Sequence, residues 1–164
     1  MKSEAIVELG KPLQTIESET PEPKGKEVLL KITHSGVCHS DVHIHDGYFD
    51  LGGGNKLPVG QMLNLPHTMG HEIEGEVAAI GPDVTDVEIG ANVVAYPWIG
   101  CGECATCKAG DEHYCNAPRQ LGIQLPGGFA DYCIVPDSKY VLDYTGIRPC
   151  LLYTSDAADE KVRG

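Results

Sequence analysis

Apolar and polar residues alternate over several short stretches of the chain, which predicts a protein built mainly from β-strands. Residues 27–33 are mostly apolar or β-branched and predict a strand that is largely buried. Residues 73–81 alternate between apolar and polar positions, as expected for a strand with one buried face. Further strands are expected in residues 91–95 and 127–136, with two short strands in residues 3–20 around a turn at positions 10–12.

Two other stretches carry signals for a helix and for a loop. Ser40 or Asp41 can cap a short helix that follows Cys38. Such a helix would hold Cys38, Ser40 and His43 on one local scaffold. Residues 46–66 include three consecutive glycines and predict one long loop, and loops of that length tend to be functional or disordered.

The composition limits the classes of protein to which the chain can belong. A length of 164 residues is enough for about one domain with a substantial core. The 12 basic and 24 acidic side chains give a formal charge of −12, which disfavours nucleic acid or an anionic membrane surface as a partner. No run of about 18 apolar residues occurs, and no apolar segment follows the first residues, so we expect a cytoplasmic protein without a membrane segment.

Four cysteines with the spacing C-x2-C-x2-C-x7-C form the strongest motif: Cys101, Cys104, Cys107 and Cys115. Two-residue gaps let thiolates turn inward on a tight loop, and four thiolates satisfy a tetrahedral ion, so the spacing favours a closed structural zinc site. A ferredoxin-type iron–sulfur run would have a three-residue last gap followed by proline, whereas Asn116 follows a longer gap here. Two disulfides are the other alternative, but the absence of a secretory context favours metal.

Cys38 and His71 are a second, weaker candidate for metal binding. A Cys and a His from separate segments can supply half of an open zinc site, in which three protein ligands leave one position for water or substrate. Glu72 follows His71 at the head of a predicted strand. On its own such a pair is weak evidence. Cys133, within the predicted late strand, is expected to be a small buried apolar side chain.

Residues 70–84, with the pattern GHE-x2-G-x5-G-x2-V, resemble the signature of zinc-containing alcohol dehydrogenases at every fixed position. The signature follows the CHSD sequence at residues 38–41 and precedes the four-cysteine loop, which is the order in the medium-chain dehydrogenase/reductase family. The resemblance implies a mainly β, GroES-like barrel with short helices and a protruding structural-zinc lobe. Residues 1–149 would form this truncated catalytic domain, and the G-x-G-x-x-G fingerprint of the family's Rossmann α/β domain is missing from the chain.

The same resemblance implies roles for the residues around the second candidate site. Cys38 and His71 would ligate a catalytic zinc, with Glu72 beside it as an occasional ligand. Asp41 would accept a hydrogen bond from His71 and fix the orientation of its ring. The four cysteines of residues 101–115 would hold a separate structural zinc.

Four further residues are implied in proton transfer and binding. Ser40 would hydrogen-bond the alcohol and pass its proton toward His43, whose unperturbed pKa of about 6.5 suits a relay at neutral pH. His39 would lie near the cofactor pyrophosphate, and Trp98 would form a wall of the substrate pocket. Simpler alternatives remain open: a helix cap for Ser40, a surface side chain for His43 and a core position for Trp98.

The implied function is oxidation of primary or secondary alcohols to aldehydes or ketones with NAD or NADP. The family's full-length enzymes would act as homodimers or homotetramers on small-molecule alcohols. One alternative is another medium-chain zinc dehydrogenase, acting on polyols, formaldehyde adducts or cinnamyl-type alcohols. A second alternative is a zinc-binding module without catalysis.

Residues 150–164 do not resemble the family's continuation. They begin with CLLYTS, which is the translation of TGT CTC TTA TAC ACA TCT, a transposase-type sequencing adapter. We therefore expect residues 150–164 to be a non-native tail. Cys150 is accordingly not assigned as the third ligand of the catalytic zinc, and the fragment is expected to be inactive alone.

Overall fold

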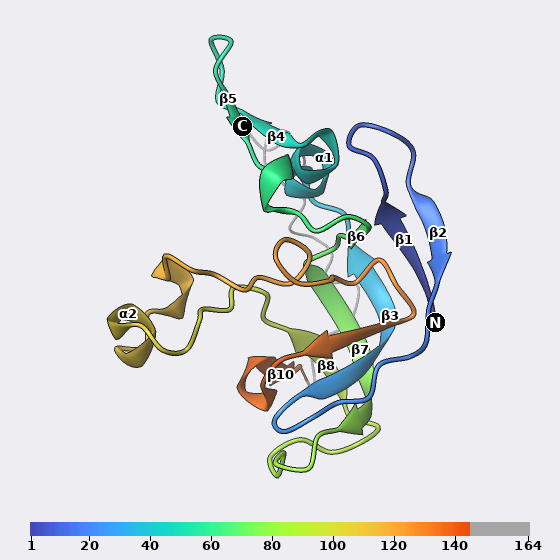
Figure 1. Cartoon of the computed structure of the whole chain (residues 1–164). Helices are drawn as coiled ribbons and strands as arrows, with labels where there is room; N and C mark the ends of the chain where they lie inside the picture. The colour runs from blue at the N-terminus through green and yellow to red at the C-terminus, as the bar shows by residue number, and fades with distance from the viewer. Residues whose placement is uncertain (145–164) are drawn as a thin grey trace, which may run out of the picture.

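A five-stranded antiparallel sheet forms the body of the molecule in the computed structural model, which describes residues 1–144 (Figure 1). The strands lie in the order β10-β8-β7-β3-β9, so neighbours in the sheet are often distant in sequence. They are β3 (Val28–Gly36), β7 (Glu72–Ile80), β8 (Asn92–Ala95), β9 (Tyr132–Val135) and β10 (Val141–Asp143). The strands predicted at 27–33, 73–81 and 91–95 are confirmed as β3, β7 and β8.

The core of this sheet follows from its apolar positions. Val28 and Leu30 of β3 are fully buried, together with Val77 of β7 and Val135 of β9. Burying an aliphatic side chain of this size contributes about 1.5–3 kcal/mol, so the apolar start of β3 stabilises the centre of the sheet. The mainly β, barrel-like fold with short helices is thereby confirmed.

A smaller three-stranded sheet stands beside the first, in the order β2-β1-β6. It contains β1 (Lys2–Ile6), β2 (Gln14–Glu17) and β6 (His67–Thr68), and β1 and β2 are the two short strands expected near the N-terminus. A second apolar cluster joins this sheet to the helix that follows β3, and its buried members are Ile6, Ile44, Leu63 and Met69.

Helix α1 (His39–Asp46) begins directly after Cys38, and Cys38 itself is the N-terminal cap. The Cys38 sulfur accepts a hydrogen bond from the Ser40 N–H at 3.3 Å, and the Asp41 carboxylate accepts one from the Cys38 N–H at 3.0 Å. The prediction that Ser40 or Asp41 is the cap is therefore wrong. The thiol takes the capping position and Asp41 makes the reciprocal bond of a capping box.

Residues 46–66 are not one long loop, as the sequence had predicted, but include a β-hairpin. Strand β4 (Tyr48–Asp50) pairs with β5 (Lys56–Pro58), and the short helix η1 (Gly60–Met62) follows. The glycines at positions 52–54 all have positive φ, which glycine adopts without steric cost, and they form the tip of the hairpin. Figure 1 shows the hairpin projecting beside α1.

The last part of the chain differs most from the expectation. Strand β9 is shorter than the predicted 127–136, because residues 127–129 hydrogen-bond to the backbone of residues 68–70 instead of joining the strand. The short helix η3 (Ser138–Tyr140) and strand β10 were not predicted. A lobe with helices α2 (Ala105–Lys108) and η2 (Glu112–Tyr114) protrudes from the barrel, as expected (Figure 1).

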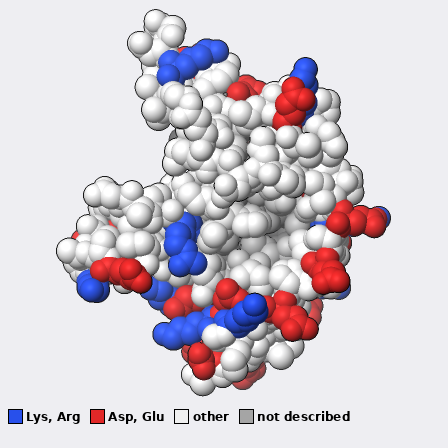
Figure 2. All heavy atoms as spheres, viewed as in Figure 1, with Lys and Arg blue, Asp and Glu red and all other residues white. Residues whose placement is uncertain are grey.

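The surface is uneven in charge. On the face drawn in Figure 2, most acidic and basic side chains lie over the lower half, and the two signs are interspersed. Basic and acidic side chains are also visible on the hairpin, whereas the surface below it is mostly uncharged. Within residues 1–144, no helix is long and apolar enough to cross a membrane.

Candidate metal centres and the adjoining pocket

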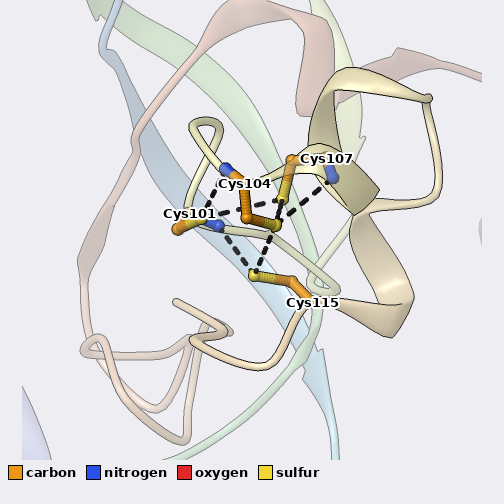
Figure 3. A group of neighbouring side chains, drawn as sticks. All are labelled: Cys101, Cys104, Cys107 and Cys115. Atoms are coloured by element: carbon orange, nitrogen blue, oxygen red, sulfur yellow. Dashed lines mark hydrogen bonds between the residues drawn. The ribbon is translucent and has the colours of Figure 1, made fainter.

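The four cysteine sulfurs of the lobe converge on one point (Figure 3). Their sulfur–sulfur distances are 3.9 Å for Cys101–Cys107, 3.4 Å for Cys104–Cys107 and 3.9 Å for Cys104–Cys115. A tetrahedral ion with zinc–sulfur bonds of about 2.3 Å would separate its sulfurs by about 3.8 Å. The thiols are therefore spaced to hold such an ion with little movement.

Backbone N–H groups of the lobe point at these sulfurs. Cys101 N–H donates to Cys115 Sγ at 3.3 Å, and Cys104 N–H donates to Cys101 Sγ at 3.4 Å. Backbone donation from Glu103 and Cys104 lowers the pKa of Cys101 to about 6, whereas burial raises the pKa of Cys107 to about 12. Four adjacent thiols cannot all ionise without a cation, and a divalent ion would remove that conflict. The donor set thus fits zinc.

A second cluster lies on the barrel and combines Cys38, Asp41 and His71. Cys38 Sγ is 3.1 Å from His71 Nε2, although Cys38 follows the end of β3 and His71 precedes the start of β7. Two such ligands on a tetrahedral zinc ion would lie about 3.6 Å apart, so a small opening of this pair would accommodate the ion. The predicted pair of metal ligands is therefore brought together by the pairing of β3 with β7.

The buried carboxylate of Asp41 contacts both Cys38 and His71 of this cluster. Its side chain is 2% exposed, accepts the Cys38 N–H and also accepts the Gly70 N–H at 3.2 Å. Its Oδ1 lies 3.4 Å from His71 Nδ1. The carboxylate raises the pKa of His71 to about 9, because it stabilises the charged ring against the effect of burial. The predicted hydrogen bond from His71 to Asp41 is not formed in this structure, because His71 Nδ1 has no hydrogen-bond partner and meets Asp41 only at ion-pair distance. The orienting role of Asp41 stays a prediction.

A cavity of about 380 Å³ opens next to this cluster. Its polar lining residues are Cys38, Ser40, His71, Glu72 and Glu74, and its apolar ones are Ile73, Val94, Ala95, Pro97 and Trp98. Of the residues predicted for a site, Ser40, Glu72 and Trp98 therefore lie in the same cavity as the candidate ligands. An apolar space with a few polar groups is typical of a small-molecule site.

Glu72 reaches the cavity because its neighbour on β3 has no side chain. A Cβ on Gly36 would come within 2.0 Å of Glu72 Oε2, so the carboxylate occupies the space that a larger residue would fill. Gly36 is a functional position that the sequence analysis missed, since a glycine at a strand end gives no signal of its own.

His39 and His43 lie apart from the lining of this cavity. Their rings stack with centroids 4.7 Å apart, one turn from each other on α1, and His43 also contacts the Phe49 ring at 4.8 Å. The half-buried His43 ring thus has a packing role in addition to any role in proton transfer. The relay from Ser40 to His43 and the placement of His39 near a cofactor stay predictions.

Two carboxylates with several partners were also missed. Glu74 of β7 is 4% exposed, lies 3.2 Å from His34 Nδ1 and accepts a hydrogen bond from the Tyr144 hydroxyl. Glu112 of the lobe accepts hydrogen bonds from Lys139 and Tyr140. Their partners are distant in sequence, so no local motif marks them.

The chain is similar to known alcohol dehydrogenases in sequence and in structure. A family model described as the alcohol dehydrogenase GroES-like domain matches residues 24–144. The NAD-dependent alcohol dehydrogenase of Saccharolobus solfataricus is 44% identical over 142 residues, which cover 86% of this chain and 40% of that protein. The chain thus spans about 40% of the length of curated relatives such as this one.

Solved structures of alcohol dehydrogenases are also similar to this chain, again over part of their own length. A thermostable alcohol dehydrogenase of Pyrobaculum aerophilum with cobalt and zinc bound is similar with a TM-score of 0.73 and 31% identity, over 90% of this chain and 42% of that one. An alcohol dehydrogenase of Escherichia coli CFT073 in complex with NADH is similar with a TM-score of 0.77 and 30% identity, over 93% of this chain and 41% of that one.

Proposed function

Because this chain belongs to the zinc-containing alcohol dehydrogenase family through its GroES-like domain, we propose that it is the N-terminal catalytic part of an NAD(P)-dependent alcohol dehydrogenase. The reaction is oxidation of a primary or secondary alcohol to an aldehyde or ketone. The observation that carries this proposal is the Cys38–His71 pair, 3.1 Å apart, in the lining of a cavity of about 380 Å³.

Two metal ions are part of the proposal. Cys101, Cys104, Cys107 and Cys115 hold a structural zinc, since four thiolates complete its coordination. Cys38 and His71 hold a catalytic zinc, with Glu72 available as an occasional ligand. The third protein ligand of this catalytic zinc comes from the native sequence beyond residues 1–149, and substrate takes the remaining position.

The chain's own residues orient the substrate and move its proton. When bound, the metal supplies Lewis-acid polarisation of the alcohol oxygen, and the nicotinamide supplies the hydride acceptor. Asp41 fixes the His71 ring through Nδ1. The Ser40 hydroxyl accepts the alcohol proton and passes one on to His43, which releases it to solvent. Trp98 and the apolar walls hold the carbon skeleton and exclude water.

The proposal extends to the rest of the protein. Residues 1–149 form the native part of the domain, residues 150–164 are a non-native tail, and His39 contacts the cofactor pyrophosphate. The tail lies outside the described residues. The full-length enzyme is a cytoplasmic homodimer or homotetramer.

The experiment uses the uninterrupted gene that encodes residues 1–149 with its downstream coding sequence. The full-length enzyme should reduce NAD or NADP with an alcohol, and the 164-residue chain should not. Ser40→Ala should lower kcat by about 10²–10⁴-fold, because the proton then lacks its adjacent acceptor. Ser18→Ala, at an exposed serine, should have no effect.

His43→Gln separates the relay from other roles of the helix. It should lower kcat by about 10²-fold or less, because water can replace the solvent end of a relay. His113→Gln is the matched control on an exposed histidine. Full activity of both His43→Gln and Ser40→Ala would show that the relay does not exist.

A further inference from the structure

Glu112 joins the four-cysteine lobe to the barrel. It opens helix η2, three residues before Cys115, and its side chain is 17% exposed. Glu112 Oε1 accepts a hydrogen bond from Lys139 Nζ at 2.5 Å, and Oε2 accepts from the Tyr140 hydroxyl and from the Gly100 N–H at 3.4 Å. Hydrogen bonds to an ionised acceptor are about twice as strong as neutral ones, so this carboxylate ties its own segment to two others, at Gly100 and at residues 139–140.

Tyr140 continues this connection into the barrel. It is 8% exposed and packs in the main apolar core. Its carbonyl oxygen accepts the Tyr96 N–H at 2.8 Å, and Tyr96 leads directly into Pro97 and Trp98. A shift of Tyr140 would therefore move the start of the segment that carries Trp98.

The same segment touches the cysteine cluster at its other end. A Cβ on Gly100 would lie 2.6 Å from Cys107 Sγ, so the backbone two residues after Trp98 is in contact with a candidate metal ligand. Trp98 stands between two cavities. It lines the larger cavity together with Cys38 and Ser40, and a cavity of about 230 Å³ between lobe and barrel together with Glu112.

We infer that Glu112 is a positioning residue that couples metal binding in the lobe to the placement of Trp98 in the wall of the substrate pocket. The metal fixes Cys107 and Cys115, which flank η2, and η2 then presents the Glu112 carboxylate to Tyr140. Without the metal, η2 becomes less ordered, and the segment that carries Trp98 is no longer held in place at Tyr96 and Gly100. This inference rests on the proposed zinc site of the lobe but assigns that site a role in shaping the pocket.

Trp98 provides the measurement, because it is the only tryptophan of the chain and is 45% exposed. The test uses the 164-residue chain carrying Cys38→Ala, so that zinc binds in the lobe alone. Zinc is titrated into metal-free protein. Bound zinc is measured by competition with a colorimetric chelator, and Trp98 by its emission maximum and its quenching by acrylamide. We expect the emission to move to shorter wavelength and the quenching to fall as one zinc ion binds.

Variants of the lobe and of Tyr140 distinguish coupling between the zinc site and Trp98 from a general loss of order in the lobe. Tyr140→Phe and Glu112→Ala should still bind one zinc ion but lose more than half of the Trp98 response. Glu112→Gln should restore part of it, because the amide oxygen can still accept from Tyr140. Glu103→Gln, at an exposed acid of the same lobe, should respond like the parent protein.

The outcomes are distinct. A full Trp98 response in Tyr140→Phe and Glu112→Ala, with zinc bound, would overturn the coupling and leave the zinc site intact. No zinc binding by the parent protein would overturn the lobe's metal site and the coupling with it. Tyr140→Phe removes a single oxygen, so it decides the matter even if Glu112→Ala fails to fold.

Discussion

Asp41 combines two tasks that are usually given to different residues. It closes the capping box of α1 through the Cys38 N–H, and it lies 3.4 Å from the His71 ring nitrogen that faces away from Cys38. The carboxylate therefore fixes both candidate metal ligands, one through the backbone and the other through the side chain.

Replacement of Asp41 should weaken metal binding more than it weakens the fold. We expect Asp41→Asn to lower the zinc affinity of the Cys38–His71 site by about 10–100-fold, since the carboxylate no longer orients the ring or raises its basicity. Competition titrations in a Cys104→Ser background measure this site alone. Asp46→Asn, at an exposed acid of the same helix, is the control. Equal affinities of Asp41→Asn and the control would contradict the orienting role.

His67 gives the protein a stability that depends on pH. Its Nε2–H donates to the Gly122 carbonyl at 2.9 Å, and burial lowers its pKa below the ordinary 6.5. The folded state therefore binds fewer protons than the unfolded state. The contribution of the neutral ring is complete above pH 6.5 and is lost as the pH falls below that value.

His67→Gln should remove this dependence, because its amide keeps a neutral donor that does not titrate. The free energy of unfolding of the native chain, relative to the variant, should fall by up to about 1.4 kcal/mol per pH unit below pH 6.5. Urea denaturation at several pH values measures the difference, in which other titrating groups cancel. Parallel pH curves for the two proteins would contradict the assignment.

At the scale of residues, site residues that belong to a local sequence motif could be predicted. Residues whose partners are distant in sequence were missed. The cysteine spacing is local, so the cluster of four thiols could be foreseen. Glu112 and Tyr140 are 28 positions apart, and Glu74 and Tyr144 are 70 apart. Only the fold brings such pairs together.

At the scale of elements, the four-cysteine lobe depends on its thiols because it has few other sources of stability. Its two helices contain four and three residues, which is too short for a helix to be stable alone. We expect Cys104→Ser to abolish one equivalent of bound zinc and to increase proteolysis within residues 101–115.

Metal analysis and limited proteolysis test this prediction. Cys133→Ser is the matched control, since that thiol is buried in the core and outside the lobe, and it should keep the full metal content. Retention of all zinc by Cys104→Ser would show that the lobe is not a four-thiolate site.

Strands with a long pattern of apolar positions were predicted from the sequence, and strands with a short pattern were not. Strands β3 and β7 each contain nine residues with clear apolar positions, so their existence follows from the sequence. Strands β4, β5 and β10 contain three residues each, and alternation over three positions carries little information. The hairpin within residues 46–66 and the last strand of the sheet were missed for this reason.

At the scale of the whole molecule, the body formed by residues 1–144 has its own core and three sheets. We therefore expect deletion of residues 150–164 to leave the zinc content and the Tm of the chain unchanged within error. Thermal unfolding and metal analysis of the two chains, at equal zinc concentration, make the comparison. A lower Tm after deletion would assign the tail to the native fold.

The two candidate metal sites differ in how much of the chain each needs, and this difference sets an order of events during synthesis. The four sulfurs of the lobe all belong to residues 101–115. Closing so short a loop costs little conformational entropy, so the sulfurs can meet as soon as Cys115 has left the ribosome. The sheet that supports Cys38 and His71 is completed only when β9 and β10 have been made. The nascent chain can therefore bring the four thiols of the lobe together while the barrel around Cys38 and His71 is still open.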